Sequence, residues 1–347
     1  MKSRGYAAQS AGSALADYPF ERRSAGVNDV VIDILYCGVC HSDIHFVNND
    51  WGRSRYPLVP GHEIVGRVSA IGEGVSRFKV GDYAGIGCFV DSCRECDACH
   101  QGEEQFCVEG MTATYGGVER GTTTLTYGGY SNNYVVDEAY ALKIAPELDL
   151  AATAPLLCAG ITTWSPLRHW KVGPGQKVGV VGLGGLGHMA VKFAKAFGAE
   201  VVMITRSESK VADAEKLGAD HVLLSTDPAA VKDWRGKLDF ILDTVSAQHS
   251  MDDNLILLKT DGVCCLVGLP EQPLAFSAFQ TVRRKIITGS FIGGIRETQE
   301  MLDFCAEHNI VSDIELIDIQ SVNEAYERVL KSDVRYRFVI DMASLDS

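Results

Sequence analysis

The sequence predicts an α/β protein in which a β-rich domain is combined with a doubly wound parallel sheet. Two observations support this fold class. Short alternating apolar runs, punctuated by glycine, dominate the first half, whereas from Lys177 onward short apolar runs alternate with helical segments. In addition, 347 residues exceed the usual size of one hydrophobic core, so we expect two domains.

The β-rich part rests on an apolar alternation with a period of two residues. Residues 30–36 and 64–71 show this alternation, residues 130–136 form another short strand candidate, and Gly81-Asp82 marks a turn. After residue 289 we expect the chain to complete this domain with helices over 297–308 and 322–330 and a strand over 337–341.

The second half predicts a complete doubly wound domain, because six apolar strands are separated by helical segments. We expect this domain at residues 153–289, inserted into a first domain made of residues 1–152 and 290–347. The six strands are predicted at 178–181, 201–204, 221–224, 240–242, 264–267 and 286–288.

The bulk composition is that of a globular protein, with 46% apolar and 22% charged residues. A net charge of −13 argues against nucleic acid or an anionic membrane surface as a partner. No apolar run approaches the ~18 residues of a membrane span. Residues 1–6 are not followed by an apolar core of signal-peptide length, so we expect a cytoplasmic protein.

Four cysteines share one short, turn-rich stretch with the spacing C-x2-C-x2-C-x7-C: Cys93, Cys96, Cys99 and Cys107. Cysteines this close in sequence pair poorly as disulfides, whereas four thiolates can bind one tetrahedral Zn²⁺. An iron–sulfur cluster remains an alternative, because it also takes four thiolates. A zinc ion with four protein ligands has no position for substrate, so this lobe (about 88–110) is predicted to be structural.

A glycine-rich turn follows the apolar strand at 177–181 and begins the helix predicted over 188–197. In this context a GxGxxG motif binds a dinucleotide, because the glycines let the backbone approach the pyrophosphate and the helix N-terminus supplies N–H donors. A glycine-rich turn without a ligand is the alternative. The motif consists of Gly182, Leu183, Gly184, Gly185, Leu186 and Gly187.

The residues after the next strand favour NADP(H) over NAD(H). An NAD site expects an acid about 20 residues after the motif, gripping the ribose 2′-hydroxyl. Here Glu208 lies several positions late, and a 2′-phosphate would instead meet hydroxyls and cations, although these could also be a solvated helix start. The candidate residues are Thr205, Arg206, Ser207 and Lys210.

A second metal site is suggested by Cys40, His62 and Cys158. A Cys₂His set with an open fourth position is used for Lewis-acid catalysis by zinc. These residues lie far apart in sequence, however, and buried structural thiols are the alternative.

The chain resembles the zinc-containing medium-chain alcohol dehydrogenases, in particular the cinnamyl-alcohol-dehydrogenase-like branch and its bacterial broad-specificity, NADPH-dependent aldehyde reductases. The resemblance covers nearly the whole chain and implies a GroES-like catalytic domain beside a Rossmann domain. Its motifs are GVCHSD at 38–43, GHE at 61–63, the four-cysteine lobe, LLCAGITT at 156–163, GLGGLG at 182–187, GSFIGG at 289–294 and VRYRFVIDM at 334–342.

The resemblance implies catalytic roles beyond the three zinc ligands. Glu63 matches a glutamate that can occupy the fourth zinc position, and Asp43 a carboxylate that orients His62. Ser42 matches the hydroxyl that exchanges a proton with the substrate, and His45 the residue that connects this relay to solvent.

The resemblance also implies cofactor contacts. The 205–210 segment is similar to the branch's 2′-phosphate loop, although Arg206 replaces a serine there. Arg337 falls on an expected pyrophosphate contact. The remaining positions are Ser42, Thr162, Thr244, Gly268, Ser290, Phe291 and Ile292.

The implied activity is reversible reduction of aromatic and aliphatic aldehydes by NADPH, with two zinc ions per chain in a homodimer. A zinc-independent quinone or enone reductase and a non-catalytic NADPH-binding protein are the alternatives. His41 is left unassigned, while Trp51, Tyr115 and Trp164 are candidates for the substrate pocket. Five further cysteines are expected to be buried thiols without metal partners: Cys37, Cys88, Cys264, Cys265 and Cys305.

Overall fold

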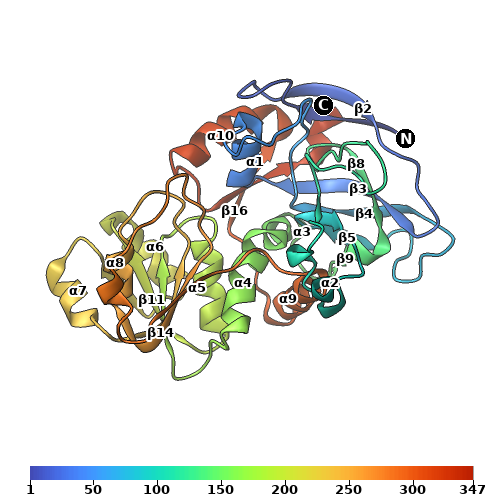
Figure 1. Ribbon diagram of the computed structural model, residues 1–347. Coiled ribbons are helices and arrows are strands. Elements are labelled where there is room, and N and C mark those ends of the chain that lie inside the picture. The colour runs from blue at the N-terminus through green and yellow to red at the C-terminus, as the bar shows by residue number, and fades with distance from the viewer. Residues whose placement is uncertain (347) are drawn as a thin grey trace. The chain divides into compact units, whose positions relative to one another are not determined.

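The computed structural model describes residues 1–346 and divides into two compact units (Figure 1). The catalytic unit comprises Met1–Ile161 and the segment from Gly293 onward, and the nucleotide unit comprises Thr162–Ile292. The first boundary therefore lies nine residues later than the predicted 152/153, and the second lies three residues later than 289/290. The shift has a physical reason, because α3 (Leu150–Thr153) and the 3₁₀ helix η3 (Ala154–Leu157) pack on the sheet of the catalytic unit.

The catalytic unit is built on a seven-stranded sheet with the order β16-β17-β3-β4-β5-β9, and β8 also pairs with β3. Its pairs are antiparallel except for β16 and β17. The long central strand β3 is buried at most positions, as its apolar run predicts. The bounds are β3 (Asp29–Gly38), β4 (Ile64–Ile71), β5 (Tyr83–Ile86), β8 (Asn133–Asp137), β9 (Leu142–Lys143), β16 (Ile314–Asp318) and β17 (Arg337–Asp341).

Two small sheets and four further helices complete the catalytic unit. One small sheet pairs β1 with β2 and the other pairs β6 with β7. Helix α10 packs on α1, and α9 packs on β9. The bounds are β1 (Lys2–Ala7), β2 (Ala16–Glu21), β6 (Phe89–Asp91), β7 (Thr112–Ala113), α1 (His41–Asn48), α2 (Asp97–Gln101), α9 (Ile295–His308) and α10 (Val322–Leu330).

The nucleotide unit contains a six-stranded, wholly parallel sheet with the order β12-β11-β10-β13-β14-β15. This is the strand order of a doubly wound dinucleotide-binding fold, so the predicted fold class is confirmed. The bounds are β10 (Lys177–Val181), β11 (Glu200–Thr205), β12 (His221–Leu224), β13 (Leu238–Asp243), β14 (Leu258–Leu266) and β15 (Ile286–Gly289).

The connecting helices pack onto this sheet. Helix α5 covers β10 and β11, α6 and α7 contact β12, and α8 contacts β14. The core beneath them is aliphatic and includes Val202, Ile204 and Ile241, all almost fully buried. The bounds are α4 (Ala159–His169), α5 (Gly187–Ala196), α6 (Val211–Lys216), α7 (Pro228–Trp234) and α8 (Met251–Leu255).

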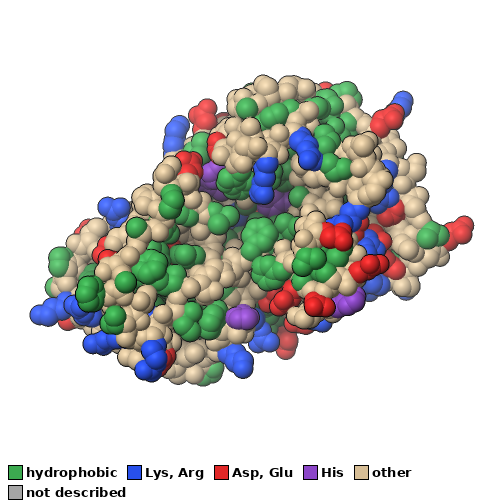
Figure 2. Space-filling view, in the orientation of Figure 1, with side chains coloured by type: hydrophobic (Ala, Val, Ile, Leu, Met, Phe, Trp, Pro, Cys, Tyr) green, Lys and Arg blue, Asp and Glu red, His purple; other side chains and the backbone are tan. Residues whose placement is uncertain are grey.

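The surface mixes charged and apolar side chains, and on the face drawn in Figure 2 acidic and basic groups are interspersed. Within residues 1–346, no single helix is long and apolar enough to cross a membrane. One bent pair, Leu150–Leu157 with Ala159–His169, passes that test jointly on length and composition alone.

Candidate active site and metal centres

Four buried side chains of the catalytic unit converge so that one ligand atom of each lies within 4.8 Å of the others: Cys40, His62, Glu63 and Cys158. The Cys40 and Cys158 sulfurs are 3.9 Å apart. Two thiolates on one zinc lie roughly 3.8 Å apart, given Zn–S bonds of about 2.3 Å in tetrahedral geometry. The His62 Nε2 atom is buried and has no hydrogen-bond partner among the described residues, as a metal-ligating nitrogen would. The donor set therefore fits a zinc ion.

The three cysteine and histidine side chains come from the ends of secondary-structure elements. Cys40 is the N-cap of α1 and lies two residues after the end of β3, and His62 immediately precedes Glu63 and β4. Cys158 lies between η3 and α4. Gly61 has a positive φ of 101°, and a Cβ there would collide with Cys37 and Tyr130, so the turn that presents His62 requires glycine.

Asp43 is fully buried beneath this cluster and accepts several hydrogen bonds. The Cys40 N–H donates to Oδ2 at 2.9 Å, in a capping box, and the Gly61 N–H donates to Oδ1 at 3.2 Å. His62 Nδ1 lies 3.4 Å from Oδ1. Asp43 thus lies beside the His62 ring, and its role in orienting that ring stays a prediction.

Glu63 forms a buried ion pair with Arg337, the first residue of β17. Arg337 Nη2 also donates to the Val39 carbonyl at 2.8 Å. Burial raises the pKa of Glu63 to about 8, although the positive charge of Arg337 acts in the opposite direction. The sequence predicted Arg337 as a pyrophosphate contact, which stays a prediction. Its pairing with Glu63 was not foreseen, because the two residues are 274 positions apart.

Hydrogen bonds with the Cys158 thiol change the pKa values of Cys40 and Cys88. A hydrogen bond with Cys158 lowers the pKa of Cys40, which favours the thiolate form that binds metals. Cys88 was expected to be a buried thiol without metal partners. It is instead partly exposed, and a hydrogen bond with Cys158 is the main cause that lowers the pKa of Cys88. The expectation was wrong on burial, since β5 ends at Ile86 and Cys88 lies beyond the covered strand.

Ser42 lies in the first turn of α1 and His45 in its last turn. The Ser42 hydroxyl lies 3.5 Å from the Cys40 sulfur, which places it beside the metal ligands. His45 Nδ1 is 2.7 Å from the carboxylate of Asp50, a partner that the sequence analysis missed. The signal for this contact in the sequence is the acidic residue five positions after the histidine.

An aromatic series leads from the surface toward His62. The ring of Trp51 lies 5.0 Å from that of His45 and 5.1 Å from that of Phe46. Phe46 contacts Tyr115, which stacks on His62 at 5.6 Å. Tyr115 thus lies beside the cluster, and Trp51 is connected to it through Phe46. Trp164 packs with Phe193 and Phe197 in the nucleotide unit, and its place in the substrate pocket stays a prediction.

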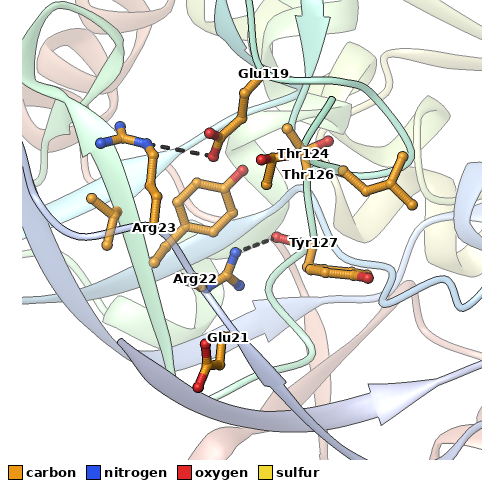
Figure 3. A pocket seen from close by; sticks show the side chains of 10 residues that line it. Glu21, Arg22, Arg23, Glu119, Thr124, Thr126 and Tyr127 are labelled. Carbon is orange, nitrogen blue, oxygen red and sulfur yellow. Dashed lines mark hydrogen bonds and ion pairs between the residues drawn. The ribbon is translucent and has the colours of Figure 1, made fainter. Parts of the chain in front are cut away.

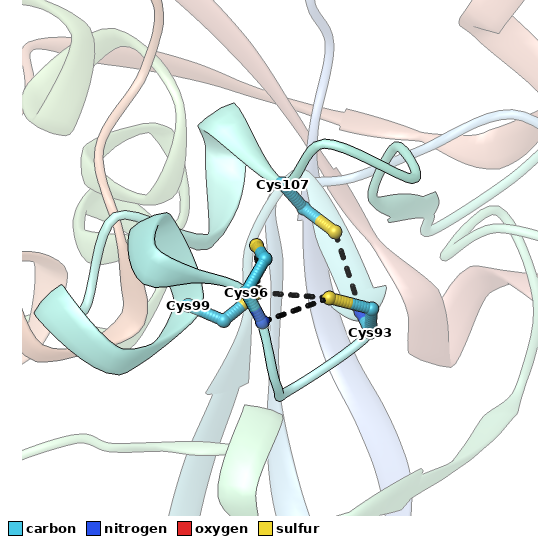
Figure 4. Close-up of side chains that lie close together, drawn as sticks. All are labelled: Cys93, Cys96, Cys99 and Cys107. Carbon is cyan, nitrogen blue, oxygen red and sulfur yellow. Dashed lines mark hydrogen bonds between the residues drawn. The ribbon is translucent and has the colours of Figure 1, made fainter.

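The second metal group is the four-cysteine lobe shown in Figure 4. Cys93 and Cys99 have sulfurs 3.8 Å apart, and those of Cys96 and Cys99 are 3.5 Å apart. Backbone N–H groups donate to the sulfurs of Cys107 and Cys93, each at 3.3 Å, as is suitable for thiolates. These separations suit thiolates that share a single ion; in an iron–sulfur cluster the four thiolates bind a cage of several irons.

The lobe also holds the start of α9. Glu104 accepts a hydrogen bond from the Ile295 N–H at 3.0 Å, and Arg296 binds the Gln101 carbonyl. A carboxylate at a helix N-terminus is stabilising, because it meets unpaired N–H donors and the positive end of the helix dipole.

In the nucleotide unit, the glycine-rich turn joins β10 to α5. Gly182 has a positive φ of 88°, and a Cβ on Gly187 would collide with the Gly182 carbonyl. A Cβ on Gly184 would meet nothing within 4 Å, so that position is open for a ligand. Leu183 is buried, while Gly185 and Leu186 are partly exposed at the helix start. Each glycine requirement of the dinucleotide motif is therefore met.

The proposed 2′-phosphate residues lie at the neighbouring strand end. The Gly182 N–H donates to the Ile204 carbonyl at 3.0 Å, which sets the glycine-rich turn beside Thr205, the last residue of β11. Arg206 and Ser207 are exposed, and Ser207 N–H donates to the Thr205 hydroxyl at 3.2 Å. Lys210 follows in a short 3₁₀ turn over Glu208–Lys210.

The remaining cofactor candidates are found mainly at the same edge of the sheet. The Thr244 hydroxyl donates to the Val181 carbonyl at 2.7 Å, and Gly268 packs against the backbone of Val245. The Ser290 N–H donates to the Leu266 carbonyl at 3.1 Å, so it too lies at a carboxyl strand end. Phe291 is exposed and Ile292 buried, with Thr162 buried within α4.

A separate small pocket in the catalytic unit lies beneath Arg22 and Arg23 (Figure 3). Arg22 donates to the Tyr127, Gly128 and Asn133 carbonyls, and Arg23 pairs with Asp29 and Glu119. Because both guanidinium groups already have partners, this pocket is a structural clamp.

Comparison with known proteins identifies the class to which this fold and site belong. Residues 26–146 match the family "Alcohol dehydrogenase GroES-like domain", and residues 185–307 match "Zinc-binding dehydrogenase". The chain belongs to the zinc-type medium-chain alcohol dehydrogenases, as its motifs predicted.

Its relatives are similar over nearly their whole length. NADP-dependent alcohol dehydrogenase C 1 of Mycolicibacterium smegmatis is 55% identical over 99% of this chain and 98% of its own. Aldehyde reductase YahK of Escherichia coli is 53% identical over 99% of both chains. The crystal structure of a cinnamyl alcohol dehydrogenase from Helicobacter pylori, complexed with NADP(H), has a TM-score of 0.93 at 43% identity over 99% of both chains.

Proposed function

We propose that this protein is a zinc-dependent NADP(H) alcohol dehydrogenase that reversibly reduces a broad range of aromatic and aliphatic aldehydes. The observation that carries the proposal is the buried Cys40–His62–Cys158 set, with its two sulfurs 3.9 Å apart and an unpartnered His62 Nε2. Three protein ligands leave a fourth position for the substrate oxygen or for Glu63.

Zinc bound here would act as a Lewis acid on the carbonyl oxygen, while the nicotinamide supplies the hydride. The chain's own residues hold and orient these groups. Asp43 fixes the His62 ring through Nδ1, and the pairing with Arg337 holds the Glu63 carboxylate. Ser42 would exchange the proton with the substrate oxygen, and His45, oriented by Asp50, would connect that proton to solvent.

The preference for NADP(H) is supported by the end of β11. The strand ends in Thr205, where an NAD site would carry an acid, and the exposed Arg206 lies next to it. A guanidinium can bind a phosphate with two hydrogen bonds. The two relatives named above as NADP-linked agree with this preference.

We further propose a second, structural zinc in the Cys93–Cys107 lobe and a cytoplasmic homodimer. A reducing compartment is supported because none of the eleven cysteines, all of which lie within residues 1–346, forms a disulfide. A dimer is supported by β15, which is an edge strand with Ile286 40% exposed, and by exposed apolar side chains shortly before it, such as Phe279 and Val282.

The test is the variant Cys158→Ala, with Cys264→Ala as a matched loss of a buried thiol on β14. We expect Cys158→Ala to abolish aldehyde reduction while NADPH still binds, as followed by cofactor fluorescence, and Cys264→Ala to keep both properties. Unchanged turnover in Cys158→Ala would instead favour a zinc-independent reductase. A wild-type protein that binds NADPH but reduces no aldehyde in a panel would favour the non-catalytic alternative.

A further inference from the structure

Buried tyrosines lie around Asp43 beneath the candidate catalytic site. Tyr130 is fully buried, Tyr326 is 8% exposed and Tyr115 is 3% exposed. The Tyr130 hydroxyl donates to Asp43 Oδ2 at 3.0 Å, and the Tyr326 hydroxyl donates to that of Tyr130 at 3.4 Å. Burying phenol hydroxyls in a core requires compensating hydrogen bonds, so the chain from the Tyr326 hydroxyl through that of Tyr130 to one carboxylate calls for an explanation.

The hydrogen bonds divide the two oxygens of Asp43 between different partners. Oδ2 accepts from the Tyr130 hydroxyl and the Cys40 N–H, whereas Oδ1 faces the Gly61 N–H and His62 Nδ1. A carboxylate held on one oxygen by two donors cannot rotate freely about its Cβ–Cγ bond. Tyr130 therefore helps to fix the oxygen that the His62 ring meets.

Tyr130 is itself attached to the backbone segment that carries His62. The N–H groups of Gly128, Gly129 and Tyr130 donate to the carbonyls of Val59, Gly61 and Pro60, at 2.8, 2.9 and 3.0 Å. A Cβ on Gly128 or Gly129 would collide with that segment or its neighbours, so the close approach depends on both glycines.

Arg22 also binds the backbone just before Tyr130. Its guanidinium donates to the Tyr127 carbonyl at 2.7 Å (Figure 3). It also donates to the Gly128 carbonyl at 2.9 Å. Tyr326 approaches from α10, which packs on α1, the helix that carries Asp43. The tyrosine pair is thus rigidly placed relative to both Asp43 and His62.

We infer that Tyr130, supported by Tyr326, is a positioning residue that orients Asp43 and, through it, the His62 imidazole for metal binding. The inference rests on the proposed catalytic zinc. Partners of metal-ligating histidines set the ring orientation and the basicity of the ligand nitrogen, and the tyrosine pair extends that support by one further layer.

The experiment uses the full-length, metal-loaded protein and three single variants. Tyr130→Phe and Tyr326→Phe each remove one hydroxyl of the pair. Tyr134→Phe is the matched control, because its buried hydroxyl donates to the Thr114 carbonyl at 2.7 Å and not to Asp43. The readouts are zinc release to a chelator, the visible spectrum of the cobalt(II)-substituted protein, and Tm.

For Tyr130→Phe we expect one of two metal ions to be released about 10-fold faster, at the lower end of the effect found for partners of metal-ligating histidines. The cobalt spectrum of that site should shift, while release of the other ion stays at the wild-type rate. Tyr134→Phe should lower Tm by about as much as Tyr130→Phe does, but it should change neither metal release nor the cobalt spectrum. A Tyr130→Phe protein with wild-type metal release and spectrum would overturn the inference.

The double variant Tyr130→Phe/Tyr326→Phe tests whether Tyr326 acts through Tyr130. We expect Tyr326→Phe to give a smaller shift in the same direction and the double variant to match Tyr130→Phe alone. Additive effects would contradict the connected arrangement. If the wild-type protein binds a single ion, the proposal of a catalytic zinc is wrong. If it binds two ions but neither tyrosine variant changes their release, only the role of the tyrosines is wrong.

Discussion

His62 owes its orientation to residues from several distant parts of the chain. Asp43 lies on α1, Tyr130 precedes β8, and Tyr326 lies on α10, yet their hydrogen bonds form one connected set. Glu63, next to His62, is held by Arg337 from β17. A histidine fixed in this way presents Nε2 with little loss of side-chain entropy on metal binding.

We expect the proposed preference for NADP(H) to depend most on Arg206. Replacing Arg206 by Ala should raise the Kd for NADPH about 10-fold, because a hydrogen bond to a charged group contributes roughly 1.5 kcal/mol or more. The Kd for NADH, which lacks the 2′-phosphate, should stay within about twofold. Cofactor fluorescence titrations measure both.

The control for this variant is Arg235→Ala, which removes an exposed cation that follows α7. It should leave both dissociation constants unchanged. An Arg206→Ala protein that loses affinity for NADPH and NADH equally would refute 2′-phosphate recognition by this residue.

At the same scale, the sequence indicated candidate ligands but not all of the contacts that support them. The spacing and motifs indicated Cys40, His62, Cys158 and Asp43, because each lies in a short recognisable segment. The pairing of Glu63 with Arg337 could not be foreseen, since it joins residues 274 positions apart with no local signal. The contact of Asp50 with His45 could have been predicted, because the two residues are only five positions apart.

At the scale of elements, the four-cysteine lobe is a support for α9. Glu104 of the lobe accepts a hydrogen bond from the first turn of that helix, and Arg296 of the helix donates one to the Gln101 carbonyl. A metal ion that holds α2 and the following turn in place would therefore also stabilise the start of α9.

Replacing Cys93 by Ser should lower thermal stability before it affects the chemistry. The lobe would keep three thiolates, and metal binding that contributes to folding would weaken. A loss of even ~1 kcal/mol lowers Tm by about 2–4 °C in proteins of 150–250 residues, so a clear decrease is expected by calorimetry.

Turnover of Cys93→Ser well below its Tm should stay close to wild type, with Cys305→Ser as the control for a cysteine outside the lobe. A Cys93→Ser protein with unchanged Tm but no activity would show that the lobe is not structural.

Most predicted strands and helices agree with the structure to within two residues at each end, but the strand predicted at 130–136 is observed at Asn133–Asp137, and β14 begins well before its apolar run. Strand β14 begins at Leu258, six residues before the predicted Cys264, because Leu258 pairs with Leu238 across an irregularity in the ladder. Lys259 to Gly262 lack the apolar character that a sequence reading requires. The first domain boundary lies later than predicted for a similar reason. The packing of η3 on β3, β4 and β5 is a tertiary contact, which a local sequence pattern does not reveal.

At the scale of the whole molecule, the proposed homodimer depends on β15. An unpaired edge strand with exposed apolar residues invites pairing with a second copy, and a lysine on that edge opposes it. Ile286→Lys should therefore shift the protein toward monomer at micromolar concentration, as measured by light scattering after size exclusion.

Ile71→Lys is the matched control, because Ile71 is 39% exposed at the end of β4 in the catalytic unit. It should leave the dimer intact. A wild-type monomer, or an Ile286→Lys protein as dimeric as wild type, would refute assembly through this strand.

We propose that one chain holds two zinc ions with different roles, a structural one in the four-cysteine lobe and a catalytic one at Cys40, His62 and Cys158. The most direct test is the zinc content of the purified, dialysed protein, compared with that of Cys158→Ala. We predict two ions per chain in the wild type and one in the variant. A single ion in the wild type, or two in the variant, would contradict the claim.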